Sequence, residues 1–343
     1  MSTTQKIIVL RFSAMGDVAM VASVLKEFSE QNPAAELIMV SRPAFKPFFD
    51  HIPNLIFHPI QPKTLHKGIN GLYQLYQELR SYQPDAIADL HDNLRSRAIS
   101  TFFRLTGTKI KRIDKGRAEK KALTRANKKV FKPLRKTVER YADVFRGLGF
   151  SIKLSHQISK SARALPYKAK TLFSDRTTKK IGISPFAQHI YKVYALEKME
   201  TVIASLSRLG YVFFIFGGGD KEQQVAENWA QKYPNTYDLI GSFNLTEELA
   251  IISNLDLMLS MDSSGMHMAS LVGIPVVSIW GPTHPYAGFL GYGQQESDCI
   301  QIDHPARPNS IYGNKPCLCG VENCIDLIEP ETIVNKIEEK LNG

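Results

Sequence analysis

Short apolar runs alternate with helical patterns along most of this 343-residue chain, and no other feature limits its possible folds as strongly. The first run, Lys6–Leu10 (KIIVL), has the β-branched content of a strand buried inside a parallel sheet. Further strands are expected at 37–40, 86–90, 180–184, 212–216, 239–240, 257–260 and 276–280. Helical patterns occupy 18–28, 72–82, 141–148, 196–209, 221–233, 247–253 (with Thr246 as its cap), a stretch beginning at 267, and 330–341. This alternation predicts an α/β fold with parallel, doubly wound sheets.

The length of the chain and one break in the alternation indicate two domains. Single cores tend to split beyond roughly 250–300 residues. The polar, basic stretch 154–170, which contains Pro166, is the best candidate for a linker. We therefore expect an N-terminal domain over 1–160, a C-terminal domain over 161–325 and a last helix within 326–343. Ligands of such folds bind at the carboxyl ends of strands, and a cleft between two halves is the expected site.

The positive charge of the chain is concentrated in one stretch. Residues 109–140, called the basic span below, contain fourteen basic and three acidic side chains, and their net charge of +11 accounts for the +10 of the whole chain. Such a cluster favours an anionic partner: phosphorylated lipid, a membrane surface or nucleic acid. The span has one aromatic residue, Phe131, so it lacks the stacking platforms of single-strand binders. A solvated, mobile loop is the alternative.

The apolar runs of the sequence predict a cytosolic chain, and this location guides the interpretation of the cysteines. No apolar stretch approaches the roughly 20 residues of a membrane helix, and the first apolar run is too short for a signal peptide. Three cysteines, Cys317, Cys319 and Cys324, form the pattern C-x-C-x4-C. Disulfides are not expected in the cytosol. The spacing is irregular and the cluster contains no His, so free thiols are expected, with a thiolate metal site as the alternative.

The densest motif is Met261–Pro285 (MDSSGMHMASLVGIPVVSIWGPTHP). A polar turn leads from a strand into a helix, whose N-terminus offers free backbone N–H groups and partial positive charge to a pyrophosphate. The candidate donor-binding residues of this turn are Asp262, Ser263, Ser264, Gly265 and His267. An ordinary capped crossover between two strands is an equally good interpretation of these residues alone.

This motif resembles the C-terminal pattern of the heptosyltransferases, glycosyltransferase family 9. The family pattern is Asp-(Ser/Thr)-Gly-x-x-His, then Leu-Gly-x-Pro, then Gly-Pro-Thr-x-Pro. Here Ser264 stands in place of the Gly, with Gly265 next, and Val272 replaces the Leu. The loop Arg11–Asp17 (RFSAMGD) resembles the family's (Lys/Arg)-x-Ser-x-x-Gly-Asp loop after the first strand.

The resemblance implies roles for individual residues. Asp17 matches the catalytic base, which would take a proton from the acceptor hydroxyl, and Lys192 matches a Lys that offsets the leaving diphosphate. Glu222 matches an acid near the nucleoside ribose, and Phe243 a side chain that lies against adenine. The residues expected on the acceptor side are Arg11, Ser13, Gly16, His91 and Arg95. Without the resemblance, an N-cap for Asp17, a surface Lys192 and a core Phe243 are the plain alternatives.

The resemblance also implies an overall function. It implies two Rossmann-like domains of GT-B type facing a cleft, with the last helix crossing back to the first domain. The reaction would be an inverting transfer, typically of heptose from ADP-heptose onto a lipopolysaccharide core, by a monomer in the cytoplasm or on the inner face of the inner membrane. No Asp-x-Asp motif is present, so no metal or other cofactor is expected. The alternatives are a nucleotide-sugar epimerase or hydrolase, a nucleic-acid-binding protein that uses the basic span, and a donor-binding protein without activity.

Overall fold

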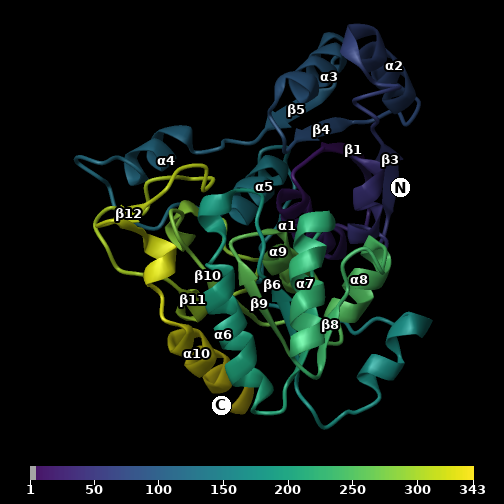
Figure 1. The fold of residues 1–343 in the computed structure, drawn as a ribbon. Helices are drawn as coiled ribbons and strands as arrows, with labels where there is room; N and C mark the ends of the chain where they lie inside the picture. The colour runs from purple at the N-terminus through teal and green to yellow at the C-terminus, as the bar shows by residue number, and fades with distance from the viewer. Residues whose placement is uncertain (1–4) are drawn as a thin grey trace. The chain divides into compact units, whose positions relative to one another are not determined.

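The computed structural model describes residues 5–343, which fall into two compact α/β units. The N-terminal unit comprises the chain up to Lys115 together with Lys136–Ser155. The C-terminal unit comprises Gly116–Arg135 and His156–Gly343. Figure 1 shows the elements of both units coloured along the chain.

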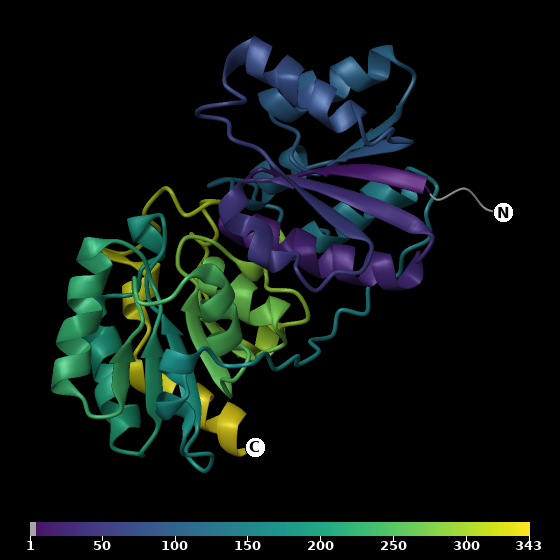
Figure 2. The same cartoon turned by 90° about the vertical axis from the view of Figure 1, so that its right-hand side faces the viewer.

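The N-terminal unit is built on a five-stranded parallel sheet with the strand order β3-β2-β1-β4-β5. Its strands are β1 (Gln5–Leu10), β2 (Ala35–Ser41), β3 (Leu55–Pro59), β4 (Ala86–Asp89) and β5 (Lys109–Arg112). Its α-helices are α1 (Met15–Gln31), α2 (Gly68–Arg80), α3 (Leu94–Leu105) and α5 (Thr137–Arg146). In Figure 2, α2 and α3 cover one face of the sheet and α1 covers the other. The central strand β1 is buried on both faces, as its apolar sequence requires.

The C-terminal unit contains a six-stranded parallel sheet with the order β11-β10-β9-β6-β7-β8. Its strands are β6 (Lys180–Ser184), β7 (Val212–Ile215), β8 (Thr236–Asp238), β9 (Leu257–Met261), β10 (Val276–Ile279) and β11 (Cys299–Ile300). Its α-helices are α4 (Arg117–Leu123), α6 (Leu196–Ser207), α7 (Asp220–Lys232), α8 (Leu245–Ile252), α9 (Ser264–Leu271) and α10 (Pro330–Asn342). The expected α/β fold with two parallel, doubly wound sheets is thereby confirmed.

Two expected elements are displaced for local reasons. The strand expected at 239–240 lies at β8, because its backbone pairs with β7 through Thr236–Asp238. Helix α8 begins at Leu245 and is capped by Asn244, not Thr246. The Asn244 side chain accepts from the backbone N–H of Glu247, whose carboxylate accepts in return from the Asn244 N–H. This reciprocal capping box outweighs a lone hydroxyl.

The middle of the basic span belongs to the C-terminal unit, so an N-terminal domain running unbroken over 1–160 is wrong. Leu123 and Leu134 are buried in a small apolar cluster with Ala287. The Leu134 N–H donates to the carbonyl of Tyr286, 2.9 Å away. The segment Gly116–Arg135, called the strap below, is therefore held by apolar burial that its charged composition conceals.

The last helix packs within its own unit rather than on the first one. Ile333 and Ile337 of α10 are fully buried in the core of the C-terminal unit, where α10 contacts α6. Ile328, two residues before this helix, is also held in the same unit, because its carbonyl accepts from the Tyr194 hydroxyl at 2.7 Å. The apolar side of α10 is thus buried within the C-terminal unit. The expectation that this helix packs on the N-terminal domain is wrong.

The longest helix, α1, has 17 residues. None of the helices within residues 5–343 is long and apolar enough to span a membrane.

A short hairpin carries the cysteine cluster. Its strands are β12 (Leu318–Cys319) and β13 (Glu322–Asn323). Cys319 and Cys324 are joined by a disulfide, whereas Cys299 and Cys317 are free. The expectation of free thiols is therefore wrong for this pair. The hairpin brings the two sulfur atoms together, and the sequence spacing alone does not predict this proximity.

Candidate functional site

Each sheet has one point where the strand order reverses, and the candidate residues gather there. In the N-terminal unit this point lies between β1 and β4, and in the C-terminal unit between β6 and β9. Open parallel sheets bind ligands beyond the carboxyl ends of the strands at such a point. The segments that follow these four strands contain Asp17, His91, Lys192 and Asp262.

Asp17 lies in the first turn of α1, where the loop after β1 ends. The N-cap of this helix is Ala14, so Asp17 is not the capping residue. Its carboxylate forms an ion pair with Arg11 and accepts from the Tyr141 hydroxyl at 3.3 Å. Its side chain is 25% exposed, so the carboxylate is fixed by two partners and still open to a ligand.

The partners of Asp17 are themselves fixed. Arg11 is 8% exposed and donates to the carbonyl of Leu90 at 2.9 Å. This arrangement makes Arg11 a positioning group for Asp17. Tyr141, from the distant helix α5, is fully buried, and burial raises the pKa of its phenol far above the ordinary value. It therefore stays protonated and donates to the carboxylate. Sequence reasoning missed Tyr141, since only tertiary structure brings α5 to α1.

His91 links the two loops at the reversal point of the N-terminal sheet. Its Nδ1 accepts from the backbone N–H of Phe12, 3.2 Å away, and the two rings meet edge to face. Burial, followed by the charges of Arg11 and Lys115, lowers the His91 pKa to about 3. The imidazole is therefore neutral near pH 7, and its place is that of a hydrogen-bonding bridge between loops.

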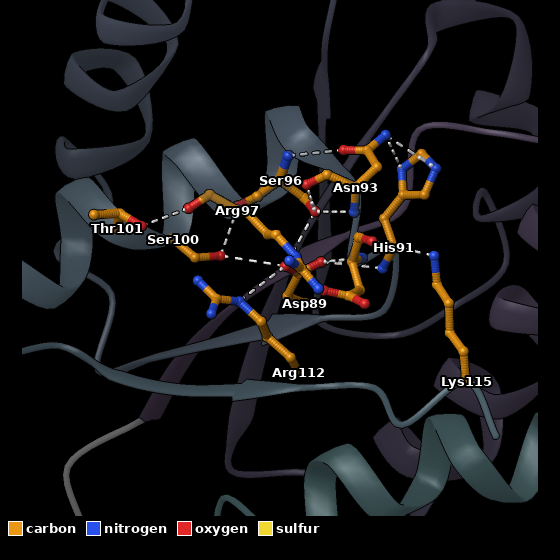
Figure 3. Close-up of polar contacts among 10 residues, drawn as sticks. Asp89, His91, Asn93, Ser96, Arg97, Ser100, Thr101, Arg112 and Lys115 are labelled. Atoms are coloured by element: carbon orange, nitrogen blue, oxygen red, sulfur yellow. Dashed lines mark hydrogen bonds and ion pairs between the residues drawn. The ribbon is translucent and has the colours of Figure 1, made fainter. Parts of the chain in front are cut away.

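Below His91, a buried carboxylate organises the loop after β4 (Figure 3). Asp89 is fully buried and accepts from the backbone N–H groups of His91 at 3.1 Å and Asp92 at 2.8 Å. It also accepts from the Ser96 hydroxyl at 3.0 Å and forms an ion pair with Arg112 at 3.5 Å. Sequence reasoning missed this residue, although a carboxylate that ends a buried strand was a usable signal.

The other residues expected on the acceptor side differ in exposure. Ser13 and Gly16 are half-buried beside Asp17, and Arg95 is exposed on the first turn of α3. The neighbouring Arg97 instead donates to the Asp92 carboxylate at 2.6 Å. Acceptor contacts by these residues stay predictions.

Lys192 and Asp262 meet at the reversal point of the C-terminal sheet. The Lys192 Nζ lies 3.0 Å from Oδ2 of Asp262, with side-chain exposures of 16% and 9%. The Thr283 hydroxyl donates to the same oxygen at 2.8 Å. Thr283 belongs to the Gly-Pro-Thr part of the Met261–Pro285 motif. The end of this motif therefore contacts the carboxylate of Asp262 at its beginning. Lys192 is thus part of a built site and not a free surface residue.

The turn before α9 presents small polar groups. Ser263 is the N-cap of α9 and makes no side-chain cap hydrogen bond. Its Oγ lies 3.3 Å from that of Ser260. Ser264 is half-buried and His267 is 7% exposed within the same short helix. The first N–H groups of α9 thus have no side-chain cap and suit an anion.

The glycine at position 265 of this turn has a packing reason. A Cβ on Gly265 would lie 2.3 Å from the Ser184 Oγ and 2.4 Å from its Cβ. The helix therefore begins in contact with the end of β6, and only glycine permits that approach.

We expect Gly265→Ala to destabilise the protein by about 1–3 kcal/mol, as overpacking does. Urea unfolding measures this change. Ser184→Gly removes both clashing atoms, so the double variant should recover part of the loss. Gly218→Ala is the control, because a Cβ there meets nothing within 4 Å. An unchanged midpoint in Gly265→Ala would contradict the close approach.

Glu222 and Phe243 follow β7 and β8, two strands that pair in the sheet of the C-terminal unit. Glu222 is in the first turn of α7, and its carboxylate accepts from the Gly218 N–H at 2.8 Å. Phe243 is half-buried between β8 and α8, so it is not a core aromatic. Both are accessible in part, and their contacts with a nucleoside stay predictions.

Comparisons with known proteins identify the family and the fold of this chain. A family model described as glycosyltransferase family 9 (heptosyltransferase) matches residues 72–311. The lipopolysaccharide core heptosyltransferase OpsX of Haemophilus influenzae is 26% identical over 287 residues, which cover 81% of this chain and 79% of the relative. Lipopolysaccharide heptosyltransferase 3 of Escherichia coli is 23% identical over 279 residues, 78% of this chain and 81% of the relative.

Solved structures show the same fold. A family 9 glycosyl transferase from Veillonella parvula superposes with a TM-score of 0.75 at 19% identity, covering 100% of this chain and 98% of the other. E. coli heptosyltransferase WaaC with ADP gives a TM-score of 0.69 at 17% identity, covering 98% and 100%. The fold is that of the GT-B heptosyltransferases. The chain belongs to glycosyltransferase family 9, and the resemblance found in its sequence is confirmed.

Proposed function

We propose that this glycosyltransferase moves heptose from ADP-heptose onto a lipopolysaccharide core or a related glycolipid, with inversion at the anomeric carbon. One observation carries the proposal: Lys192, Asp262 and Thr283 meet beside the N-terminus of α9. A cationic side chain, hydroxyl groups and helix N–H donors at one reversal point suit a nucleoside diphosphate. The names of the curated relatives give the sugar and the acceptor class.

The chemistry follows from the groups in each unit. In the proposed step the acceptor oxygen attacks the anomeric carbon, the bond from that carbon to the diphosphate breaks, and ADP leaves. Asp17 takes the proton of the acceptor hydroxyl, since a carboxylate keeps lone pairs for a third partner beside Arg11 and Tyr141. Lys192 offsets the charge that develops on the leaving diphosphate. These groups supply the charges and the base that the proposed step needs, and we propose no metal ion in the catalytic step itself.

The proposal is tested with purified protein, ADP-heptose and a lipopolysaccharide core that lacks heptose. The expected result is ADP release that depends on the acceptor and a mass gain of one heptose on the glycolipid. UDP- and GDP-sugars serve as donor controls, and thermal shift ranks all donors, because only a matched ligand stabilises the folded chain. Sugar release or isomerisation without transfer would favour the epimerase or hydrolase alternative instead.

The strap gives a second, more specific proposal about the acceptor. Lys120 is 8% exposed and lies over the Phe289 ring, and Lys129 donates to the carbonyls of Pro305 and Arg307 at 2.8 and 2.9 Å. These two cations therefore hold the strap in place. Other cations of the strap are exposed, and four of them are Lys121, Arg125, Lys128 and Lys132. We propose that these four attract the phosphorylated acceptor at the cytoplasmic face of the inner membrane, where the monomer works.

Reversing the four exposed charges to Glu should raise the acceptor KM at least ~10-fold, since each cation contributes roughly 1 kcal/mol of attraction to an anionic surface. ADP affinity should stay unchanged. The control reverses four exposed cations elsewhere in the same unit: Lys168, Lys170, Arg176 and Lys179. Steady-state kinetics at two salt concentrations measures both sets. Equal effects of the two sets would remove the specific role of the strap.

A further inference from the structure

Four potential metal ligands converge beside the hairpin of β12 and β13. The sulfurs of Cys319 and Cys324 and a ring nitrogen of His304 all lie within 4.8 Å of one another. Cys317 adds a third sulfur, 2.9 Å from that of Cys324. The catalytic proposal above uses none of these side chains.

The hairpin explains why the three cysteines meet. Leu318 pairs with Asn323 and Cys319 with Glu322, which places Cys317 opposite Cys324 at the open end. The Cys324 N–H donates to the Cys317 carbonyl at 2.7 Å. Gly320 has a φ of +84° in the turn, a conformation that favours glycine. His304 comes from a loop before the hairpin. The absence of His inside C-x-C-x4-C therefore does not argue against a metal site.

The donor set and its burial resemble a closed structural metal site. Cys317 and Cys324 are each 1% exposed. Three thiolates with one imidazole form the closed, four-ligand set of structural Zn²⁺, and thiolates also suit iron. The disulfide between Cys319 and Cys324 accounts for two of these groups. It gives no reason for a third buried sulfur and an imidazole to gather at the same point.

The surrounding charge suits thiolates as well. Three thiolates on a divalent ion leave one excess negative charge. Arg307 and Lys129 are the cations that act on the Cys317 sulfur, and Arg307 is 3% exposed. The carboxylate of Asp303 also acts on this buried guanidinium, and a metal–thiolate centre would add a second negative group beside it.

We infer that Cys317, Cys319, Cys324 and His304 bind one transition-metal ion, zinc or iron, when the chain is kept under reducing conditions. The inference rests on the proposed function in one respect. The proposed sugar donor, ADP-heptose, is a cytosolic compound, so the enzyme would work where disulfides are rare. The role of the ion is structural, because four protein ligands leave no open position for a substrate. The loop that carries these ligands lies against the candidate donor site.

Two contacts connect this loop to the donor site. Arg307 donates to the carbonyls of Gly281 at 2.6 Å and Thr283 at 3.0 Å, and so supports the motif whose hydroxyl contacts Asp262. A Cβ on Gly313 would lie 2.2 Å from the Lys192 side chain, so this glycine lies directly against it. Metal binding would thus hold two sides of the Lys192–Asp262 pair.

The test begins with wild-type protein purified with a thiol reductant and without chelator. Elemental analysis should find about one zinc or iron per chain, and the identity of the ion separates the two. Thiol titration after denaturation without reductant should detect all four cysteines. Two thiols and no bound metal, in protein also offered Zn²⁺ and Fe²⁺ under reducing conditions, would overturn the inference in favour of the disulfide.

Variants locate the ion and test its structural role. Cys317→Ser and Cys324→Ser should lose most of the metal, whereas Cys299→Ser, whose sulfur lies by Ser278 on β10, should keep it. ADP affinity should fall several-fold after chelation and recover with metal. Metal content is measured without any transfer assay. A chain without metal would therefore contradict this inference and leave the proposed transfer reaction untouched. If a variant unfolds, Co²⁺ in the wild-type chain still reports the ligands through thiolate-to-cobalt charge-transfer absorption. A cobalt complex without that absorption would contradict the thiolate set.

Discussion

Asp17→Asn is expected to lower kcat for heptose transfer by ~10²–10⁴-fold, the usual contribution of a positioned general base. The amide keeps the size of the carboxylate and can still accept from the Tyr141 hydroxyl, but it cannot take the acceptor proton. ADP binding should be unchanged, because the proposed donor groups belong to the other unit. Steady-state kinetics and calorimetric ADP titration measure the two effects separately.

Glu30→Gln is the matched control for this experiment. It makes the same chemical change on the same helix, at an exposed position near the other end of α1. Its kcat should equal that of the wild type. If Asp17→Asn transfers heptose within a few-fold of the wild-type rate, Asp17 is not the base.

Lys192→Gln should weaken ADP binding at least ~10-fold and lower kcat/KM by ~10²–10³-fold, as loss of a preorganised charge partner does. Lys192 is the ion-pair partner of Asp262, and both side chains are largely buried. The ammonium would interact with the diphosphate more strongly as charge develops on it, so kcat should fall along with affinity.

Loss of Lys192 also leaves a buried carboxylate without its cation, which destabilises the fold on its own. The double variant Lys192→Gln, Asp262→Asn removes this penalty and should recover thermal stability but not ADP affinity. Lys168→Gln, an exposed lysine in the same unit, is the control. Recovery of ADP affinity in the double variant would mean that Lys192 acts only through the fold.

The sequence predicted the central strands well because buried parallel strands are short apolar runs whose chemistry is local. It missed the edge strands β3, β5 and β11, which have no such run. It also placed Lys192 and Asp262 after the two strands that flank one reversal point. It did not predict Tyr141 or Arg307. Each of these acts through a contact between segments more than twenty residues apart, Tyr141 with Asp17 and Arg307 with Gly281. No local pattern encodes such a pair.

The strap shows a different limit of sequence reasoning. Its charge density indicated a solvated loop or a binding surface, and the exposure of Lys121 and Lys128 is compatible with either interpretation. The same composition concealed Lys120 and Lys129, whose ammonium groups lie on an aromatic ring and on two carbonyls. Net charge records how many cations are present and not which of them have structural partners.

The path of the chain has a practical consequence for engineering. The polypeptide passes from one unit to the other after Lys115, after Arg135 and after Ser155. A fragment ending near residue 160 would therefore expose Leu123 and Leu134, and the complementary fragment would uncover Ala287 and the aromatic residues around it. Chimeras that exchange acceptor specificity between family members need three junctions rather than one. The strap should be kept with the C-terminal unit, although its sequence lies between two segments of the N-terminal unit.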